Sequence, residues 1–178
     1  MATKKSPYYI LHGYNGHANE NWFPWLKAEL EKRGEEVVVP DFPEAGFPAL
    51  EKWLTLLKDE VKKHGEGVLI GHSLGGALAM RYLESGGHPK KIVLAAAPFG
   101  ELPEFPQING FLSKPFVLSN KQIFDTEFLI FYTASDDDPY VPPEHVQDWA
   151  KLTGVKPILL ENKGHFNQET FPEILDYL

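Results

Sequence analysis

"IGHSLGG" (residues 70–76) places one serine, Ser73, between two glycines directly after an apolar run. The pattern G-x-S-x-G is typical of a sharp turn between a strand and a helix, in which the serine hydroxyl is held out toward substrate. The preceding "GVLIG" (67–71) has the apolar character of a buried strand, and the following "LGGALAMRYLE" (74–84) that of a helix. We therefore expect a strand, a tight turn at Ser73 and a helix in succession.

The same alternation of apolar runs and amphipathic segments extends over the whole chain. The predicted strands are "YYILH" (8–12), "EVVVP" (36–40), "GVLIG" (67–71), "KIVLAAA" (91–97), "FLIFYTA" (128–134) and "KPILLE" (156–161). Helices are expected at 20–33 and 48–63, directly after Ser73, near Ser119, at Pro143 and near Gln168. Because the strands are continuously apolar and alternate with helices, the sequence predicts a three-layer α/β/α sandwich with a mostly parallel sheet of about six strands.

Composition narrows the range of functions. The chain has 178 residues, of which 43% are hydrophobic, so one domain over residues 1–178 is expected. A net charge of −8 at pH 7 argues against nucleic acid and against anionic membranes as partners. The absence of cysteine excludes disulfides, thiolate catalysis and zinc sites of the cysteine type. No apolar run is long enough for a membrane span or a signal peptide, so we expect a cytoplasmic protein.

Polar motifs follow four of the predicted strands. "HGYNGH" (12–17) follows the first, Ser73 the third, "SDDDPYVPP" (135–143) the fifth and "NKGHFNQ" (162–168) the sixth. Ligands bind at the carboxyl ends of the strands in a parallel sheet, so these motifs are expected to meet. A serine, an acid and a histidine thus occur in that order, each in a loop at the same edge of the sheet.

These motifs resemble those of the α/β-hydrolases, and the chain is similar to the small serine hydrolases of the retinoblastoma-binding protein nine and YdeN type. The motifs that carry the resemblance are "LHGYNG" (11–16) followed by "NWFPWL" (21–26), "IGHSLGGALAMRYLE" (70–84), "ASDDDPYVP" (134–142) and "NKGHF" (162–166). They span nearly the whole chain. The resemblance implies a compact α/β-hydrolase fold without a large cap.

Ser73 is the expected nucleophile, and it needs a neighbouring base to accept its proton. The resemblance assigns that role to His165, which follows the last strand in a glycine turn. His12 and His72 are the rival histidines: we expect His12 to order its own loop, and the turn at Ser73 to direct the His72 side chain away.

The acid is expected among three consecutive aspartates. Many hydrolases carry it as D-x-x-V-P, which matches Asp138, and its role would be to orient the imidazole of His165. Asp136 and Asp137 are then expected to be solvated. A calcium loop does not fit, because glycine is missing at its sixth position and Gln147 stands where a bidentate glutamate is needed.

Two backbone N–H groups should form the oxyanion hole, one after the nucleophile and one from the first loop. They are those of Leu74 and Tyr14, with Asn15 as an alternative to Tyr14.

The residues expected to line the substrate pocket are His12, Trp22, Phe99, Tyr140 and Phe166. The segment 98–127, rich in proline and phenylalanine, lies where larger hydrolases insert a cap. Its Phe99, Phe105, Phe111 and Phe116 either line an acyl pocket or cover the edge of the sheet.

The sequence therefore predicts a serine hydrolase, of carboxylesterase type, that cleaves a small ester, thioester or amide through an acyl-enzyme. The partner is a small-molecule acyl substrate, while a protein partner stays open. No clustered ligand set and no G-x-G-x-x-G loop occurs, so we expect no metal and no cofactor. The alternative is a protein-binding module that retains the fold; three suitable side chains in three suitable loops favour the enzyme, because fold alone does not decide function.

Overall fold

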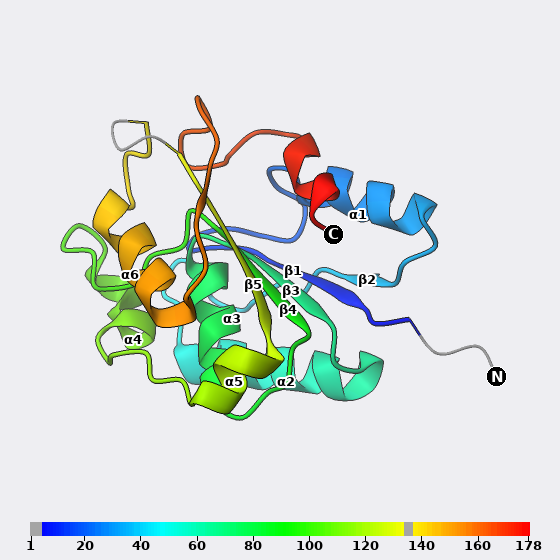
Figure 1. Ribbon diagram of the computed structural model, residues 1–178, viewed down its shortest axis with the longest axis horizontal. Helices are drawn as coiled ribbons and strands as arrows, with labels where there is room; N and C mark the ends of the chain where they lie inside the picture. The colour runs from blue at the N-terminus through cyan, green and yellow to red at the C-terminus, as the bar shows by residue number, and fades with distance from the viewer. Residues whose placement is uncertain (1–4, 134–136) are drawn as a thin grey trace.

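The computed structural model describes residues 5–133 and 137–178. Its strands are β1 (Tyr8–Leu11), β2 (Val37–Val38), β3 (Val68–His72), β4 (Lys91–Ala95), β5 (Glu127–Tyr132) and β6 (Ile158–Leu159). They form one sheet of order β2-β1-β3-β4-β5-β6, in which every neighbouring pair is parallel (Figure 1). The predicted fold class is confirmed.

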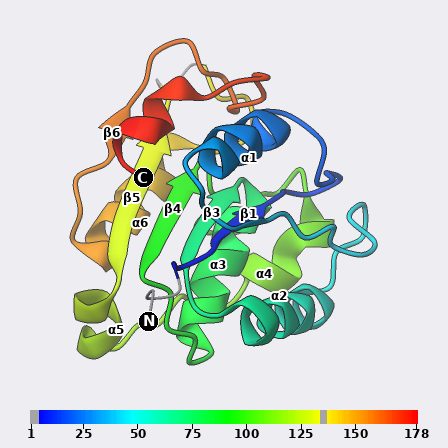
Figure 2. The same cartoon turned by 90° about the vertical axis from the view of Figure 1, so that its right-hand side faces the viewer.

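The helices connect successive strands and lie on both faces of the sheet. They are α1 (Phe23–Lys32), α2 (Leu50–His64), α3 (Leu74–Glu84), α4 (Asn109–Leu112), α5 (Asn120–Asp125) and α6 (Pro143–Thr153), with 3₁₀ helices η1 (Pro106–Ile108) and η2 (Pro172–Asp176). Figure 2 shows α1 and the C-terminal η2 on one face, and α2, α3 and α6 on the other.

Successive side chains of a strand point to opposite faces, so each strand contributes to two cores. Ile10, Ile70 and Val93 pack with α1 and η2 in one core. Leu11 and Leu94 pack with α2, α3 and α6 in the other. The continuous apolar runs in the sequence are explained by this double burial.

The edge strands β2 and β6 are two residues each, shorter than the predicted 36–40 and 156–161. As edge strands, β2 pairs only with β1, and β6 pairs only with β5. The other residues of the two predicted runs form no strand pairing. The helix predicted near Gln168 is replaced by η2, which starts at Pro172. Proline has no N–H to donate, so it cannot continue a helix begun at Gln168 and occurs instead in the first turn of a new one. Residue 134 of the predicted fifth strand lies outside the described residues.

Segment 98–127 runs between β4 and β5 through η1, α4 and α5 and adds no cap domain. The expected helix near Ser119 is α5, which begins with a capping box between Ser119 and Gln122. Arg81 of α3 fastens the segment to the core by donating to the carbonyls of Phe111, Lys114 and Pro115.

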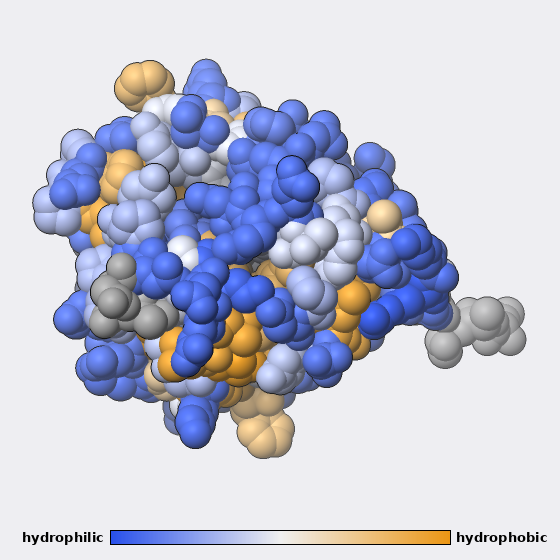
Figure 3. All heavy atoms as spheres, turned by 90° about the horizontal axis from the view of Figure 1, so that it is seen from above, coloured by the Kyte–Doolittle hydropathy of each residue, from blue (hydrophilic) through white to orange (hydrophobic). Residues whose placement is uncertain are grey.

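The surface seen from above in Figure 3 is mostly hydrophilic, with smaller apolar areas between the polar side chains. In the described ranges, no helix combines the length and apolar character needed to cross a bilayer.

Candidate active site

Ser73 occupies the turn between β3 and α3, in a backbone conformation that few non-glycine residues adopt. Its φ is 52° and its ψ is −125°. Such left-handed conformations are costly for residues with a Cβ and persist only where the surrounding structure enforces them. Here the N–H of Ser73 donates to the carbonyl of Ala95 at 2.9 Å, which ties the turn to β4.

The glycines around Ser73 are required by direct backbone contact. A Cβ on Gly71 would lie 2.4 Å from the backbone of Gly76, and a Cβ on Gly75 would lie 2.2 Å from the carbonyl oxygen of Leu11. Distances below about 3 Å are steric clashes, so neither position tolerates a side chain without a backbone shift. The glycine pattern therefore reflects a helix start that packs tightly against β1 and β3.

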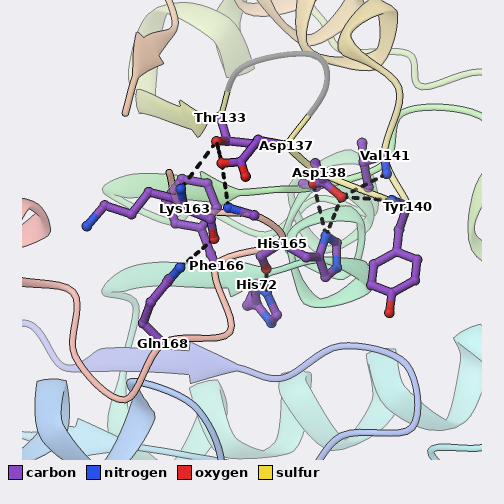
Figure 4. Close-up of polar contacts among 12 residues, drawn as sticks. His72, Thr133, Asp137, Asp138, Tyr140, Val141, Lys163, His165, Phe166 and Gln168 are labelled. Carbon is purple, nitrogen blue, oxygen red and sulfur yellow. Dashed lines mark hydrogen bonds and ion pairs between the residues drawn. The ribbon is translucent and has the colours of Figure 1, made fainter. Parts of the chain in front are cut away.

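His165 and Asp138 are in contact. The Nδ1 atom of His165 lies 3.1 Å from Oδ1 and 3.0 Å from Oδ2 of Asp138 (Figure 4). The backbone N–H groups of Tyr140 and Val141 donate to Oδ1 of the same carboxylate, at 2.9 and 3.1 Å. With Nδ1–H donated to Asp138, the other ring nitrogen, Nε2, is left as the basic one.

Ser73 and His165 line the same pocket. Within the described residues, no hydrogen bond joins the Ser73 hydroxyl to the ring of His165. Hydrogen bonds between catalytic groups are often long in a site without substrate and shorten in the reacting complex.

His72 is buried under His165, with its ring beside Trp22 and Phe23. Its Nε2–H donates to the backbone carbonyl of His165 at 2.6 Å (Figure 4), and His72 is one of the residues that line the pocket. Burial lowers the pKa of His72 to about 3, so the ring is neutral at neutral pH. Its second nitrogen, Nδ1, has no partner among the described residues. His72 thus supports the loop that carries His165.

The two N–H groups predicted for the oxyanion hole lie near Ser73. Leu74 is the first residue of α3, so its N–H has no acceptor within the helix. Tyr14 follows Gly13, where an added Cβ would lie 2.9 Å from Cβ of Ser73. The N–H of the alternative, Asn15, donates to the carbonyl of Ala45 at 2.7 Å, which removes it as a second donor.

His12 holds the loop after β1 in place. Its Nδ1–H donates to the carbonyl of Gly13 at 2.9 Å, and its Nε2 accepts from the N–H of Phe42, also at 2.9 Å. The ring is fully buried against Phe42 and Trp53. The expected ordering role fits these contacts, whereas the expected place of His12 in the pocket is wrong.

The pocket at Ser73 has a volume of about 410 Å³. Its lining consists of Gly13, Tyr14, Asn15, Glu20, Asn21, His72, Ser73, Leu102, Phe105, Ile108, Tyr140, Val141, His165 and Asn167. These residues come from the loops after β1, β3, β4, β5 and β6. The polar motifs that we expected to meet at the carboxyl edge of the sheet do meet there.

Of the five residues predicted to line the pocket, the structure places only Tyr140 there. Trp22 and Phe166 are fully buried in the core beside α1, where the indole N–H of Trp22 donates to the carbonyl of Phe166 at 3.0 Å. Phe99 packs against Phe116 and Trp149. Large apolar residues close to the site motifs are thus used for the core.

Asp137 was predicted to be solvated, but its carboxylate makes two hydrogen bonds within the protein. Its Oδ2 accepts hydrogen bonds from the hydroxyl of Thr133 at 2.5 Å and from the N–H of Gly164 at 2.8 Å (Figure 4). These two hydrogen bonds lower the pKa of its carboxyl group. Asp137 therefore joins the loop of Asp138 to the loop of His165. Asp136 lies outside the described residues.

Several lining residues were not predicted. Leu102 and Ile108 lie in segment 98–127, of which only the phenylalanines were predicted as candidates for an acyl pocket. Glu20, Asn21 and Asn167 lie next to motifs that were recognised. Their closeness in sequence to a motif could have indicated these residues. The direction of their side chains could not be predicted, because it depends on loop conformations that the sequence pattern does not encode. In the described part of the chain, no group of three His, Asp or Glu side chains is placed to hold a metal.

The chain is similar in sequence to known serine hydrolases. The family model of the serine hydrolases matches residues 8–175. YdeN of Bacillus subtilis (strain 168) is 29% identical over 178 residues, covering 96% of this chain and 93% of that protein. Serine hydrolase RBBP9 of Rattus norvegicus is 25% identical over 159 residues, covering 89% of this chain and 84% of that protein.

Solved structures show the same fold. The crystal structure of the ydeN gene product from B. subtilis superimposes with a TM-score of 0.86 at 25% identity, over 97% of this chain and 96% of that one. Est1E from Butyrivibrio proteoclasticus, solved with ferulic acid bound, gives a TM-score of 0.73 at 20% identity, over 99% and 88% of the two chains. At that identity the second likeness shows the fold alone. The match over residues 8–175 establishes that the chain belongs to the serine hydrolase family, as a small α/β-hydrolase of the YdeN and RBBP9 type.

Proposed function

We propose that Ser73, His165 and Asp138 form a catalytic triad that hydrolyses a small ester, thioester or amide. The observation that carries the proposal is the contact of His165 Nδ1 with both oxygens of Asp138, because His165 lines the same pocket as Ser73, which is held at positive φ. Nucleophile, base and orienting acid are the three groups that acyl transfer by serine requires.

In the first half-reaction, Ser73 Oγ attacks the carbonyl carbon while His165 Nε2 accepts the hydroxyl proton. The N–H groups of Leu74 and Tyr14 donate to the oxyanion of the tetrahedral intermediate. His165 then returns the proton to the leaving alcohol, thiol or amine as the bond to carbon breaks. Asp138 stabilises the imidazolium in between and fixes its tautomer.

In the second half-reaction, water attacks the acyl-enzyme and gives its proton to His165 Nε2. Collapse of the second tetrahedral intermediate returns this proton to Ser73 Oγ and releases the carboxylic acid. Neither half-reaction requires a metal or a cofactor. The pocket of about 410 Å³ suits a small substrate, since pockets for drug-sized ligands start at about 300 Å³.

The test is labelling of the purified protein with a fluorophosphonate probe, beside Ser73→Ala and His165→Gln. We expect labelling of the wild type, none in Ser73→Ala, and a loss of more than about 100-fold in the labelling rate of His165→Gln. Turnover of short-chain acyl esters should likewise be fastest in the wild type, strongly reduced in His165→Gln and absent in Ser73→Ala. A folded wild-type protein that neither reacts with the probe nor hydrolyses any ester would contradict the proposal and favour a protein-binding module.

A further inference from the structure

The pocket at Ser73 combines two kinds of lining. Leu102, Phe105 and Ile108, from the segment after β4, present apolar side chains. Asn15, Glu20 and Asn21, from the loop between β1 and α1, present polar ones. A substrate that fills this pocket therefore needs an apolar part and a part that can form hydrogen bonds.

Among the described residues that line the pocket, Glu20 is the only carboxylate, and none is a lysine or an arginine. The side chain of Glu20 is 25% exposed. Its nearest basic partner is the exposed ring of His17, at the long distance of 4.0 Å between Nε2 and Oε2. The negative charge at this side of the pocket is thus only weakly balanced by the protein.

The position of Glu20 is built into the loop. Its Oε1 lies 2.3 Å from the place where a Cβ of Gly16 would be, so the carboxylate packs over a glycine that leaves room for it. Burial raises the pKa of Glu20, and the smaller opposing effect of His17 does not offset it. The carboxylate of Glu20 is thus partly desolvated, and its partners are a backbone hydrogen bond and the distant ring of His17. Such a carboxylate interacts favourably with an incoming cation and unfavourably with an anion.

We propose that Glu20 makes the site selective for acyl substrates that carry an ammonium group, over neutral substrates of the same shape and against anionic ones. The apolar part of the substrate packs against Leu102, Phe105 and Ile108. This inference rests on the proposed function, because it concerns what is presented to Ser73. Glu20 takes no part in bond making or breaking.

The experiment compares kcat/KM for three matched esters that end in a trimethylammonium, a tert-butyl or a carboxylate group. Trimethylammonium and tert-butyl have nearly the same shape, so their ratio isolates the charge. One series carries these groups in the acyl part and a second in the alcohol part. We expect a cationic-to-neutral ratio of roughly fivefold in at least one series, and the anionic ester to be the slowest.

Glu20→Gln keeps the size of the side chain and should bring that ratio close to one. Glu31→Gln, on the exposed side of α1, removes the same charge away from the pocket and should leave the ratio as in the wild type. A wild-type ratio of one in both series, or a ratio that Glu20→Gln leaves unchanged, would overturn the proposal.

A second measurement separates this inference from the proposed function. If no ester is hydrolysed and Ser73 is not labelled, the proposed function fails. Binding of the trimethylammonium and tert-butyl amides to Ser73→Ala, which lacks the nucleophile, is then measured by calorimetry. A Kd ratio of roughly fivefold that the added Glu20→Gln change abolishes would uphold the selectivity of Glu20. Equal Kd values, or no binding of either amide, would overturn it.

Discussion

Asp137 acts on the site through two hydrogen bonds although its own side chain does not line the pocket of Ser73. It precedes Asp138 in one loop and holds the N–H of Gly164, the residue before His165, in the other. His72 supports the same loop from below through the carbonyl of His165. His165 is therefore fixed on three sides: through its ring by Asp138, and through the backbone by Asp137 and His72.

Replacing Asp137 by alanine should lower kcat more than it raises KM. Loss of the acceptor frees the N–H of Gly164, and displacement of His165 relative to Ser73 is expected to cost about tenfold in kcat. The Thr133 hydroxyl also loses its acceptor, so we expect the free energy of unfolding to fall as well. Steady-state kinetics and urea unfolding measure the two effects.

Asp137→Asn keeps one acceptor oxygen and should fall between the wild type and Asp137→Ala in kcat. Glu161→Gln is the charge control, because Glu161 is exposed shortly before the same loop. If Asp137→Ala left kcat unchanged while its stability fell, the role of Asp137 in positioning His165 would be disproved.

At the scale of secondary-structure elements, the approach of α3 to β1 and β3 determines where Ser73 lies. Gly75→Ala would place a Cβ 2.2 Å from the carbonyl oxygen of Leu11 and 2.7 Å from that of His12. We expect a loss of about 3 kcal/mol or more in the free energy of unfolding, because backbone atoms cannot move aside as side chains do. The rate of fluorophosphonate labelling should fall as well, since Leu74 and Ser73 move with the helix.

Gly110→Ala in α4 is the matched control for Gly75→Ala. Nothing lies within 4 Å of the place where its Cβ would be, and its φ is not positive. Alanine at such a helical position should stabilise the protein by up to about 1 kcal/mol. If Gly75→Ala and Gly110→Ala changed the free energy of unfolding equally, the close approach of α3 to β1 would not be needed for stability.

Arg81 connects α3 to the segment that supplies the apolar part of the pocket. Its guanidinium donates to three carbonyls of that segment, pairs with Glu84 and lies 3.7 Å over the ring of Phe116. Arg81→Met leaves the carbonyls without donors, and we expect a cost of about 2–3 kcal/mol in the free energy of unfolding. Faster cleavage within residues 98–127 in limited proteolysis would locate the loosened region, whereas a wild-type cleavage pattern would count against this role of Arg81.

The elements were predictable from the sequence where burial on both faces leaves a continuous apolar run, as in β3, β4 and β5. They were less predictable at β2 and β6, where the ladder ends at the edge of the sheet and the apolar run continues into a loop. The turn at Ser73 was predictable because backbone contact leaves glycine as the one residue that fits. The lining of the pocket was not predictable in the same way. Trp22 and Phe166 are aromatic residues of the kind that line pockets, and only packing decides which apolar side chain faces the core.

At the scale of the whole molecule, the sheet separates two cores, and the site lies at the edge where the loops from both cores meet. Helix α1 and the loop of His165 belong to one core through Trp22 and Phe166. Helices α2, α3 and α6 belong to the other core. Stability and activity are therefore coupled through residues that are both buried in the fold and in contact with the site, of which His72 is the clearest.

His72 links the stability of the whole protein to pH. Its pKa is about 3 in the folded protein because of burial, whereas an unfolded histidine has a pKa of about 6.5. Between these two values the unfolded chain binds one proton more than the folded protein at this position. The free energy of unfolding should therefore decrease as the pH falls through this window, by up to about 1.4 kcal/mol per pH unit from this residue.

Other groups also titrate between pH 6.5 and pH 3, so the contribution of His72 is measured as a difference. His72→Gln can still donate an amide N–H to the carbonyl of His165 but binds no proton in this range. The free energy of unfolding is measured with urea at a series of pH values. We expect the wild type to lose stability relative to His72→Gln as the solution becomes more acidic. Above pH 7.5 the free energies of the two proteins should change with pH in parallel. Parallel curves throughout the acid range would mean that the ring becomes charged in the folded state, and that the packing of His72 beneath His165 tolerates a buried positive charge.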